Sequence, residues 1–238
     1  MKNILSVDTA SPRLRLAYGP DNGSPIAVFE EDVDNHGPGL IPRIDTLLQG
    51  AGPDVIDALV CCRGPGSFTG IRIGLSFAKT LTVMRNIPLF LVDTFALHFE
   101  LTPPDVTCVW VLLDARRGEL YAQARGEIAL DTMSQVVTIE DVLQTASTHA
   151  KFVGSGADVY FQELESRFGA GCVLTPQPDA YTLHNIAKKC VHEDLPVDPV
   201  RAEPLYLRKS DAELNFAAGR IRSAWSRVFP LSCEQEPS

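Results

Sequence analysis

A glycine-rich loop at Arg63–Gly70 is the stretch of this sequence best suited by composition to bind a ligand. Ser67 or Thr69 can cap a helix that follows it, and backbone N–H groups at a helix start attract anions. The loop departs from the common phosphate-binding patterns, because no Gly-Lys-Ser/Thr follows it and its glycines lack the G-x-G-x-x-G spacing. An anion site and a tight strand-to-helix turn both stay open, and we favour the turn.

Two aspartates offer the carboxylates that a catalytic or metal site would need. Asp8 ends the apolar run Ile4–Val7, and Asp114 ends a second apolar run. This recurrence suggests a duplicated architecture. Histidine and cysteine spacing gives little support for a metal site, since the five histidines form no HxxxH or HExxH pattern and the six cysteines no CxxC pair. The adjacent Cys61 and Cys62 are expected to be buried thiols.

The charge balance bears on which partners the chain can bind alone. Its 238 residues include 30 acidic and 21 basic side chains, for a formal net charge of -9. A protein that grips a nucleic-acid backbone by itself presents a basic stripe, so independent RNA binding is not expected. The first apolar run is too short for a signal peptide, and no run of 18 apolar residues could span a membrane. These features predict a cytoplasmic protein.

The pattern of apolar residues predicts the elements that position the loop and the aspartates. Three short strands with turn signals between them indicate an antiparallel meander near the N-terminus. A helix, a buried strand, the glycine-rich loop, a long helix and a further strand follow, and the pattern restarts after Pro103-Pro104. The predicted strands are Ile4–Val7, Leu14–Tyr18, Ile26–Phe29, Ala58–Cys62, Ile87–Val92, Val106–Leu113, Glu119–Ala124 and Val136–Ile139.

The long helix predicted after the loop has two apolar faces. At about 100° per residue, one face carries Ile71, Leu75 and Ala78. The opposite face carries Ile73, Phe77, Leu81 and Met84. One face can pack on a sheet while the other requires a neighbour, either within the chain or on another chain. Gly74 is expected to let a neighbouring helix approach closely.

Four segments together resemble the TsaB (YeaZ) family. Leu5–Thr9 is similar to the family's opening strand, Asp114–Tyr121 to the segment that opens its second lobe, and Glu203–Arg208 to a motif near its C-terminus. The most specific segment is the family signature, which here consists of Gly64, Pro65, Gly66, Ser67, Phe68, Thr69, Gly70, Ile71, Arg72, Ile73 and Gly74.

The resemblance implies an α/β fold of two ribonuclease H-like lobes from the actin, Hsp70 and sugar-kinase (ASKHA) superfamily. Each lobe would hold a mixed five-stranded sheet flanked by helices. Residues 1–103 would form the N-terminal lobe with the partner-binding helices, and residues 104–209 the C-terminal lobe. Residues 210–238 would be a C-terminal helix or tail of unassigned packing.

The resemblance also implies a function. TsaB-like proteins are non-catalytic scaffold or activator subunits that pair with a larger paralogue, TsaD, which carries the metal and nucleotide chemistry. An ATPase, TsaE, joins the pair, and together they threonylcarbamoylate adenosine 37 of ANN-decoding tRNAs. Contact with tRNA would be indirect, and the isolated chain would form a homodimer. No metal or cofactor is expected in the isolated chain, and ATP or ADP is expected only at the interface of the complex.

Three sets of residues become candidate sites on this basis, none of them catalytic. The signature loop comprises Arg63–Gly70 and Arg72. A relic of the superfamily's nucleotide cleft would include Asp8, Thr9, Asp114, Arg116, Gly154 and Gly156. The helical partner-binding face would comprise Leu40, Ile41, Ile44, Leu48, Ile71, Ile73, Leu75, Phe77 and Ala78.

Other functions are weighed beside this one. An autonomous M22-type peptidase would need a metal, a nucleophile–base pair or an acid dyad, and the sequence assigns no histidine partner to Ser67 or Cys62. A small-molecule kinase of the same superfamily would need both phosphate loops intact. A homodimeric interaction module would use the same helical face on a second copy.

Overall fold

A computed structural model describes residues 1–33, 37, 39–126 and 134–208 of the chain. Compact packing extends from Met1 to Leu207, and Arg208–Ser238 forms a separate unit. The predicted C-terminal helix or tail at 210–238 therefore lies outside the described residues. No described helix has a run of apolar residues long enough to cross a bilayer.

The first sheet is mixed and five-stranded, with the order β3-β2-β1-β4-β5. It begins with the predicted antiparallel meander, and the last two strands pair in parallel. β1 and β4 are buried along nearly their whole length, as expected for central strands covered on both faces. The strands are β1 (Asn3–Asp8), β2 (Arg13–Pro20), β3 (Ala27–Asp32), β4 (Ala58–Cys62) and β5 (Leu89–Val92).

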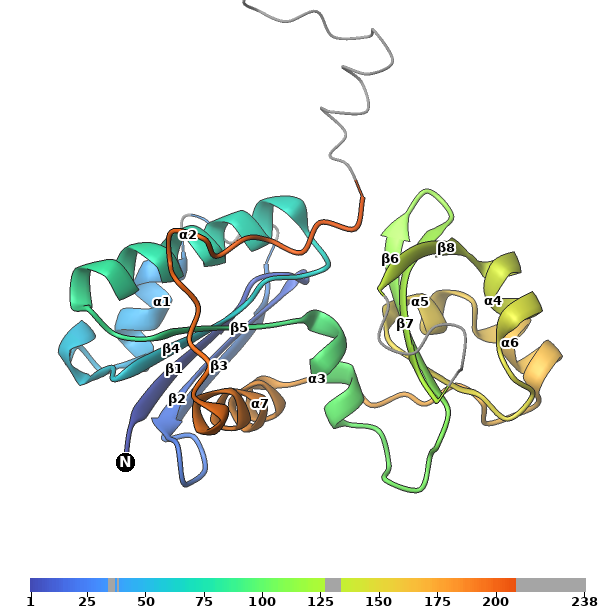
Figure 1. The fold of residues 1–238 in the computed structure, drawn as a ribbon, viewed down its shortest axis with the longest axis horizontal. Helices are drawn as coiled ribbons and strands as arrows, with labels where there is room; N and C mark the ends of the chain where they lie inside the picture. Colours follow the sequence, from blue (N-terminus) through green and yellow to red (C-terminus); the bar gives the residue numbers. More distant parts are fainter. Residues whose placement is uncertain (34–36, 38, 127–133, 209–238) are drawn as a thin grey trace, which may run out of the picture. The chain divides into compact units, whose positions relative to one another are not determined.

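Helices cover both faces of this sheet (Figure 1). α1 (Leu40–Leu47) and α2 (Phe68–Arg85) lie on one face, and α7 (Ala180–Glu193) lies on the other. The alternation of side chains along a strand sends Leu5 of β1 toward α1 and α2, and Ile4 toward α7. The short 3₁₀ helix η1 (Pro53–Val55) precedes β4.

The second sheet is also mixed, with the order β8-β7-β6-β9. We expected five strands, and the described residues form four. A single parallel bridge between Phe152 and Val173 continues the sheet beyond β9. The elements are β6 (Val109–Arg116), β7 (Glu119–Arg125), β8 (Gln135–Thr138), β9 (Lys151–Val153), α4 (Ile139–Thr145), α5 (Ser155–Val159) and α6 (Phe161–Phe168).

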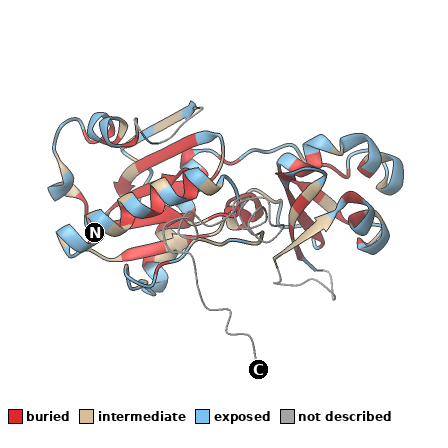
Figure 2. Cartoon of the chain, turned by 90° about the horizontal axis from the view of Figure 1, so that it is seen from above, coloured by how far each residue is buried: buried red, intermediate tan, exposed pale blue. Residues whose placement is uncertain are grey.

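The predicted lobe boundary at Pro103-Pro104 separates the two sheets but not all of their helices. α7 comes from the predicted C-terminal lobe, yet its apolar side packs on β4 and β5 of the first sheet. α3 (Thr94–Glu100) connects the halves, since Phe95 and Phe99 pack with Val109 and Val111 of β6. In Figure 2 the central strands of both sheets are largely red, which marks buried residues.

The segment after α7 returns to the first sheet and runs along α2 as a strap, defined here as residues 195–207 (Figure 1). The Val197 N–H donates to the Leu89 carbonyl at the free edge of β5. The Lys79 ammonium of α2 donates to the Ala202 carbonyl at 2.9 Å. The strap therefore covers an exposed sheet edge and ends beside the start of α2.

Candidate functional site

The signature loop joins β4 to α2 as a tight turn, which is the alternative that we favoured. Ser67 caps the helix, because its hydroxyl accepts from the Gly70 N–H at 3.2 Å. The Ser67 N–H donates to the Ala10 carbonyl at 2.6 Å. A side chain at Gly66 would collide with that same carbonyl. Two N–H groups that an anion would need are thus occupied by protein oxygens.

The other end of the loop is bound to α3 and the strap. Thr94, at the start of α3, donates its N–H to the Gly64 carbonyl and its hydroxyl to the Pro65 carbonyl, each at 2.8 Å. The Gly64–Pro65 peptide bond is cis. Arg63 pairs with Asp93 at 2.5 Å, and its carbonyl accepts from Leu205 of the strap. The loop therefore connects β4 and α2 with the turn after β1, with α3 and with the strap.

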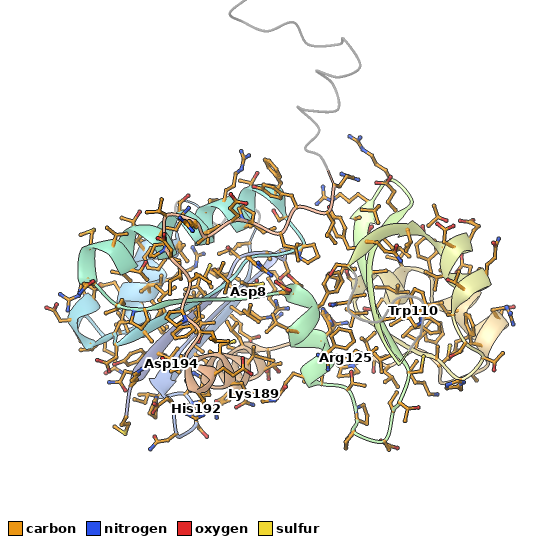
Figure 3. The ribbon with its side chains drawn as sticks, viewed as in Figure 1. Asp8, Trp110, Arg125, Lys189, His192 and Asp194 are labelled. Carbon is orange, nitrogen blue, oxygen red and sulfur yellow. The ribbon has the colours of Figure 1, made fainter. Side chains whose placement is uncertain are left out.

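The carboxylate at the end of β1 is neutralised within the protein. Asp8, labelled in Figure 3, is fully buried and pairs with the Arg15 guanidinium at 2.8 Å. Its second oxygen accepts from the Ala10 N–H at 2.9 Å, and Arg15 also donates to the Pro178 carbonyl. A metal ion does not fit here, because the oxygens it would bind are engaged with an arginine and an amide. The described residues form no group of three acids, histidines or cysteines that could hold a metal.

Gly74 has a different role from the one that we expected. A Cβ at this position would collide with the Thr9 hydroxyl, which donates to the Gly70 carbonyl at 2.7 Å. The missing side chain admits the turn after β1 rather than a neighbouring helix. Thr9 thus joins the first nucleotide-relic turn to the signature loop.

The remaining relic residues lie together at the end of β6. Asp114 accepts from the Arg116 N–H at 2.7 Å and donates its own N–H to the Ser155 hydroxyl. Asp114 and Arg116 are exposed residues in the last part of β6. Gly154 and Gly156 lack the Cβ that would collide with β6 or β7, so they let α5 pack closely against the second sheet.

The predicted partner-binding face divides into a buried and an exposed part. Six of its nine residues point from α1 and α2 into the core and expose at most 6% of their surface, so they present little surface to a partner. These six core residues are Leu40, Ile44, Leu48, Ile71, Leu75 and Ala78. The other three remain accessible, since Ile41 is 68% exposed and Ile73 and Phe77 are half-buried.

The exposed part belongs to an apolar groove of about 760 Å³ along the outer side of α1 and α2. Leu81 and Met84 also line it, although we did not count them in the partner-binding face. The helical period had placed both on the face of Ile73 and Phe77, so the signal was present in the sequence. The groove is lined by Gly37, Leu40, Ile41, Phe68, Thr69, Arg72, Ile73, Ser76, Phe77, Thr80, Leu81 and Met84.

An aromatic and cationic cluster stands where the groove meets the start of α2. The rings of Phe68 and Tyr206 stack with centroids 4.6 Å apart. The Arg72 guanidinium lies 3.9 Å above the Phe68 ring and donates to the Tyr206 hydroxyl at 2.8 Å. Sequence reasoning included Tyr206 in the motif Glu203–Arg208 but did not predict its contact with Arg72, because 134 residues separate the two.

The nucleophilic and titratable side chains near the first sheet are poorly suited to catalysis. Cys61 and Cys62 are fully buried, and burial raises the pKa of both thiols. His98 of α3 is only 6% exposed, and burial, with a smaller contribution from Arg15, lowers its pKa to about 4.

Comparison with known proteins identifies the family of this chain. A family model described as TsaD, tRNA N6-adenosine threonylcarbamoyltransferase, matches residues 30–162. The tRNA threonylcarbamoyladenosine biosynthesis protein TsaB of Escherichia coli K12 is 30% identical over 225 residues, covering 88% of this chain and 96% of the relative. TsaB of Bacillus subtilis 168 is 28% identical over 230 residues, covering 88% and 96%.

A solved structure shows the same fold. YeaZ from Pseudomonas aeruginosa superposes with a TM-score of 0.69 at 24% identity, covering 85% of this chain and all of that one. The family model spans more than half of this chain, and the similarity to TsaB extends over nearly the whole length of the relatives. The chain belongs to the TsaB family of tRNA threonylcarbamoyladenosine biosynthesis proteins.

Proposed function

We propose that this protein is a non-catalytic subunit that binds a TsaD-type paralogue through the apolar groove of α1 and α2. With TsaD and TsaE it would support threonylcarbamoylation of adenosine 37 in ANN-decoding tRNAs, and it would act in the cytoplasm. The observation that carries the proposal is the groove itself, where Ile73 and Phe77 present apolar surface to solvent beside the exposed Ile41.

The two faces of α2 differ in what covers them. Its inner face is already buried on the sheet, so the apolar outer face is left for another molecule. Covering such surface contributes about 25 cal/mol per Å² before the costs of association. A partner with two helices of its own would form a four-helix contact with α1 and α2.

A subunit role also accounts for the state of the nucleotide-relic residues. Arg15 neutralises Asp8, and the Thr9 turn packs under the signature loop. The chain alone would accordingly bind neither metal nor nucleotide, and ATP or ADP would bind only at an interface of the complex. The net charge of -9 favours tRNA contact through the partner rather than directly.

The same groove supports self-association when the partner is absent. An accessible apolar face on a single chain tends to pair with a copy of itself. We therefore expect the purified protein to be a homodimer that exchanges for the heterodimer when the paralogue is added. Light scattering with and without the paralogue distinguishes these states.

The peptidase alternative is not favoured. The Ser67 hydroxyl accepts from the Gly70 N–H as a helix cap. The Cys62 thiol is fully buried with a raised pKa, so it is a poor nucleophile at neutral pH.

Single charges in the groove test the proposal. Ile73→Asp and Phe77→Asp place a carboxylate on the outer face of α2, and each should abolish co-purification with the paralogue and the tRNA modification activity of the mixture. Ile26→Asp is the matched control, because Ile26 is 67% exposed and lies in the β2–β3 connection rather than in the groove. Unchanged binding by both groove variants would refute the proposal.

A further inference from the structure

We infer that Arg72 is a fixed anchor for a carboxylate on the docking partner. The inference rests on the proposed docking function and identifies one charged group that the partner must supply. Arg72 lines the groove on the second turn of α2, next to Ile73. A partner seated on Ile73 and Phe77 would therefore also cover the guanidinium.

The guanidinium is held in one orientation before any partner arrives. Its carbon lies 3.9 Å above the Phe68 ring, and Phe68 stacks in turn on Tyr206. Its Nε donates to the Tyr206 hydroxyl at 2.8 Å, which fixes the rotation of the planar group. A preorganised side chain loses less conformational freedom on binding than a free one.

The charge of Arg72 is not compensated within the described residues. Three other arginines around α1 and α2 form ion pairs: Arg43 with Glu31, Arg63 with Asp93, and Arg85 with Asp54. Arg72 has no acidic partner among the residues that the structure describes. Its Nε is used, so the terminal nitrogens can still donate in parallel to a carboxylate.

In the docked state, the charge of Arg72 would favour a partner that carries a carboxylate at the matching position. A guanidinium covered by an apolar surface would lose water without replacement, and an unpaired buried charge is strongly unfavourable. A carboxylate at the matching position would replace that water with two charge-assisted hydrogen bonds. A protein helix with apolar residues and one acid fits both the groove and the guanidinium, whereas an RNA backbone would not fill the apolar groove.

Titration of the purified TsaD paralogue against the full-length chain tests the anchor. At 50 mM salt, Arg72→Gln should weaken binding about tenfold, as for loss of one charged interface pair. The dependence of affinity on salt should become shallower in this variant. Arg72→Lys should lose less affinity but more than a neutral surface change, because lysine keeps the charge without the planar fork.

Two further variants test whether the loss of affinity comes from the Arg72 guanidinium itself. One removes the Tyr206 hydroxyl that orients the guanidinium, and the other makes the same change in net charge elsewhere in the chain. Tyr206→Phe keeps the ring stack but removes the hydrogen bond to Nε, so binding should weaken by about threefold or less with the salt dependence retained. Arg167→Gln makes the same charge change on α6, where that guanidinium also lies near an aromatic ring, and should bind like the unmodified chain.

The outcomes distinguish failure of the anchor from failure of docking. If Ile73→Asp and Phe77→Asp lose binding while Arg72→Gln does not, the groove docks a partner without a carboxylate anchor and the inference is wrong. The inference also fails if Arg72→Gln weakens only tRNA binding by the assembled complex, since the guanidinium would then face phosphate. If the groove variants bind normally, the proposed function fails and the anchor with it.

Discussion

At the scale of single residues, several residues of this protein have a structural role that differs from the one their type suggests. Asp8 stands at the end of β1, where a carboxylate could hold a metal, yet Arg15 neutralises it. Gly74 reads as a helix-packing residue, yet it makes room for Thr9. Each role depends on a neighbour brought in by the fold, so residue type alone does not reveal it.

His98 gives a prediction at this scale. Burial lowers its pKa to about 4 from an ordinary value near 6.5. The unfolded chain therefore binds more protons than the folded one between these pH values, and stability falls as pH drops from about 6.5 to about 4. At pH 4.5 the loss from this residue should be about 2 kcal/mol.

Urea unfolding at pH 7 and at pH 4.5 measures that loss. His98→Gln should reduce the difference in the free energy of unfolding between the two conditions by about 2 kcal/mol. The exposed His149, changed to Gln, should leave the difference as it is. Equal pH dependence in the His98 variant and the unmodified chain would contradict the assignment.

At the scale of elements, local pattern predicted most of the first sheet and the two helices α1 and α2 on one of its faces, but not α7 on the other. The meander, the buried strand β4 and the long helix α2 follow from alternation, turn signals and helical period, which depend on neighbours in sequence. The two faces of α2 were also predicted, but which face points outward was not. The orientation of α2 depends on the first sheet. Leu75 and Ala78 pack in the core over this sheet, whereas Ile73 and Phe77 stay partly exposed on the outer side of the helix.

A matched pair of truncations on α2 tests this orientation. Leu75→Ala should lower the free energy of unfolding by about 3 kcal/mol, because Leu75 is 4% exposed and its loss leaves a cavity over the sheet. Ile73→Ala, half-buried on the outer face, should cost less than about 1 kcal/mol and should weaken partner binding instead. The reverse order in denaturant titrations would mean that the helix is rotated.

At the scale of the whole molecule, the features that could not be predicted are contacts between residues far apart in the sequence. α7 returns from the second half to cover the first sheet, and the strap returns to α2. Arg15 reaches Pro178 across 163 residues, and Arg72 reaches Tyr206 across 134. No periodicity or spacing signals such pairs, so the sequence indicated two apolar faces on α2 but not the cluster of Phe68, Arg72 and Tyr206.

The Asp8–Arg15 pair gives a prediction at this scale, because it links the first sheet to the segment that leads into α7. Arg15→Met should destabilise the fold by about 3–5 kcal/mol, since it leaves a buried carboxylate without a partner. Adding Asp8→Asn should recover part of that loss by removing the charge. A double variant that unfolds as easily as Arg15→Met in urea would argue against an electrostatic origin.

The strap has a consequence for when the proposed docking surface is complete in a growing chain. The signature loop obtains one of its hydrogen bonds from Leu205, and the guanidinium of Arg72 is oriented by Tyr206. Both residues leave the ribosome after all the strands and helices described here have been made. In the proposed docking function, a nascent chain would therefore carry the apolar surface of α2 well before Tyr206, which orients the guanidinium, and full selectivity for the partner would begin once Tyr206 has packed on Phe68.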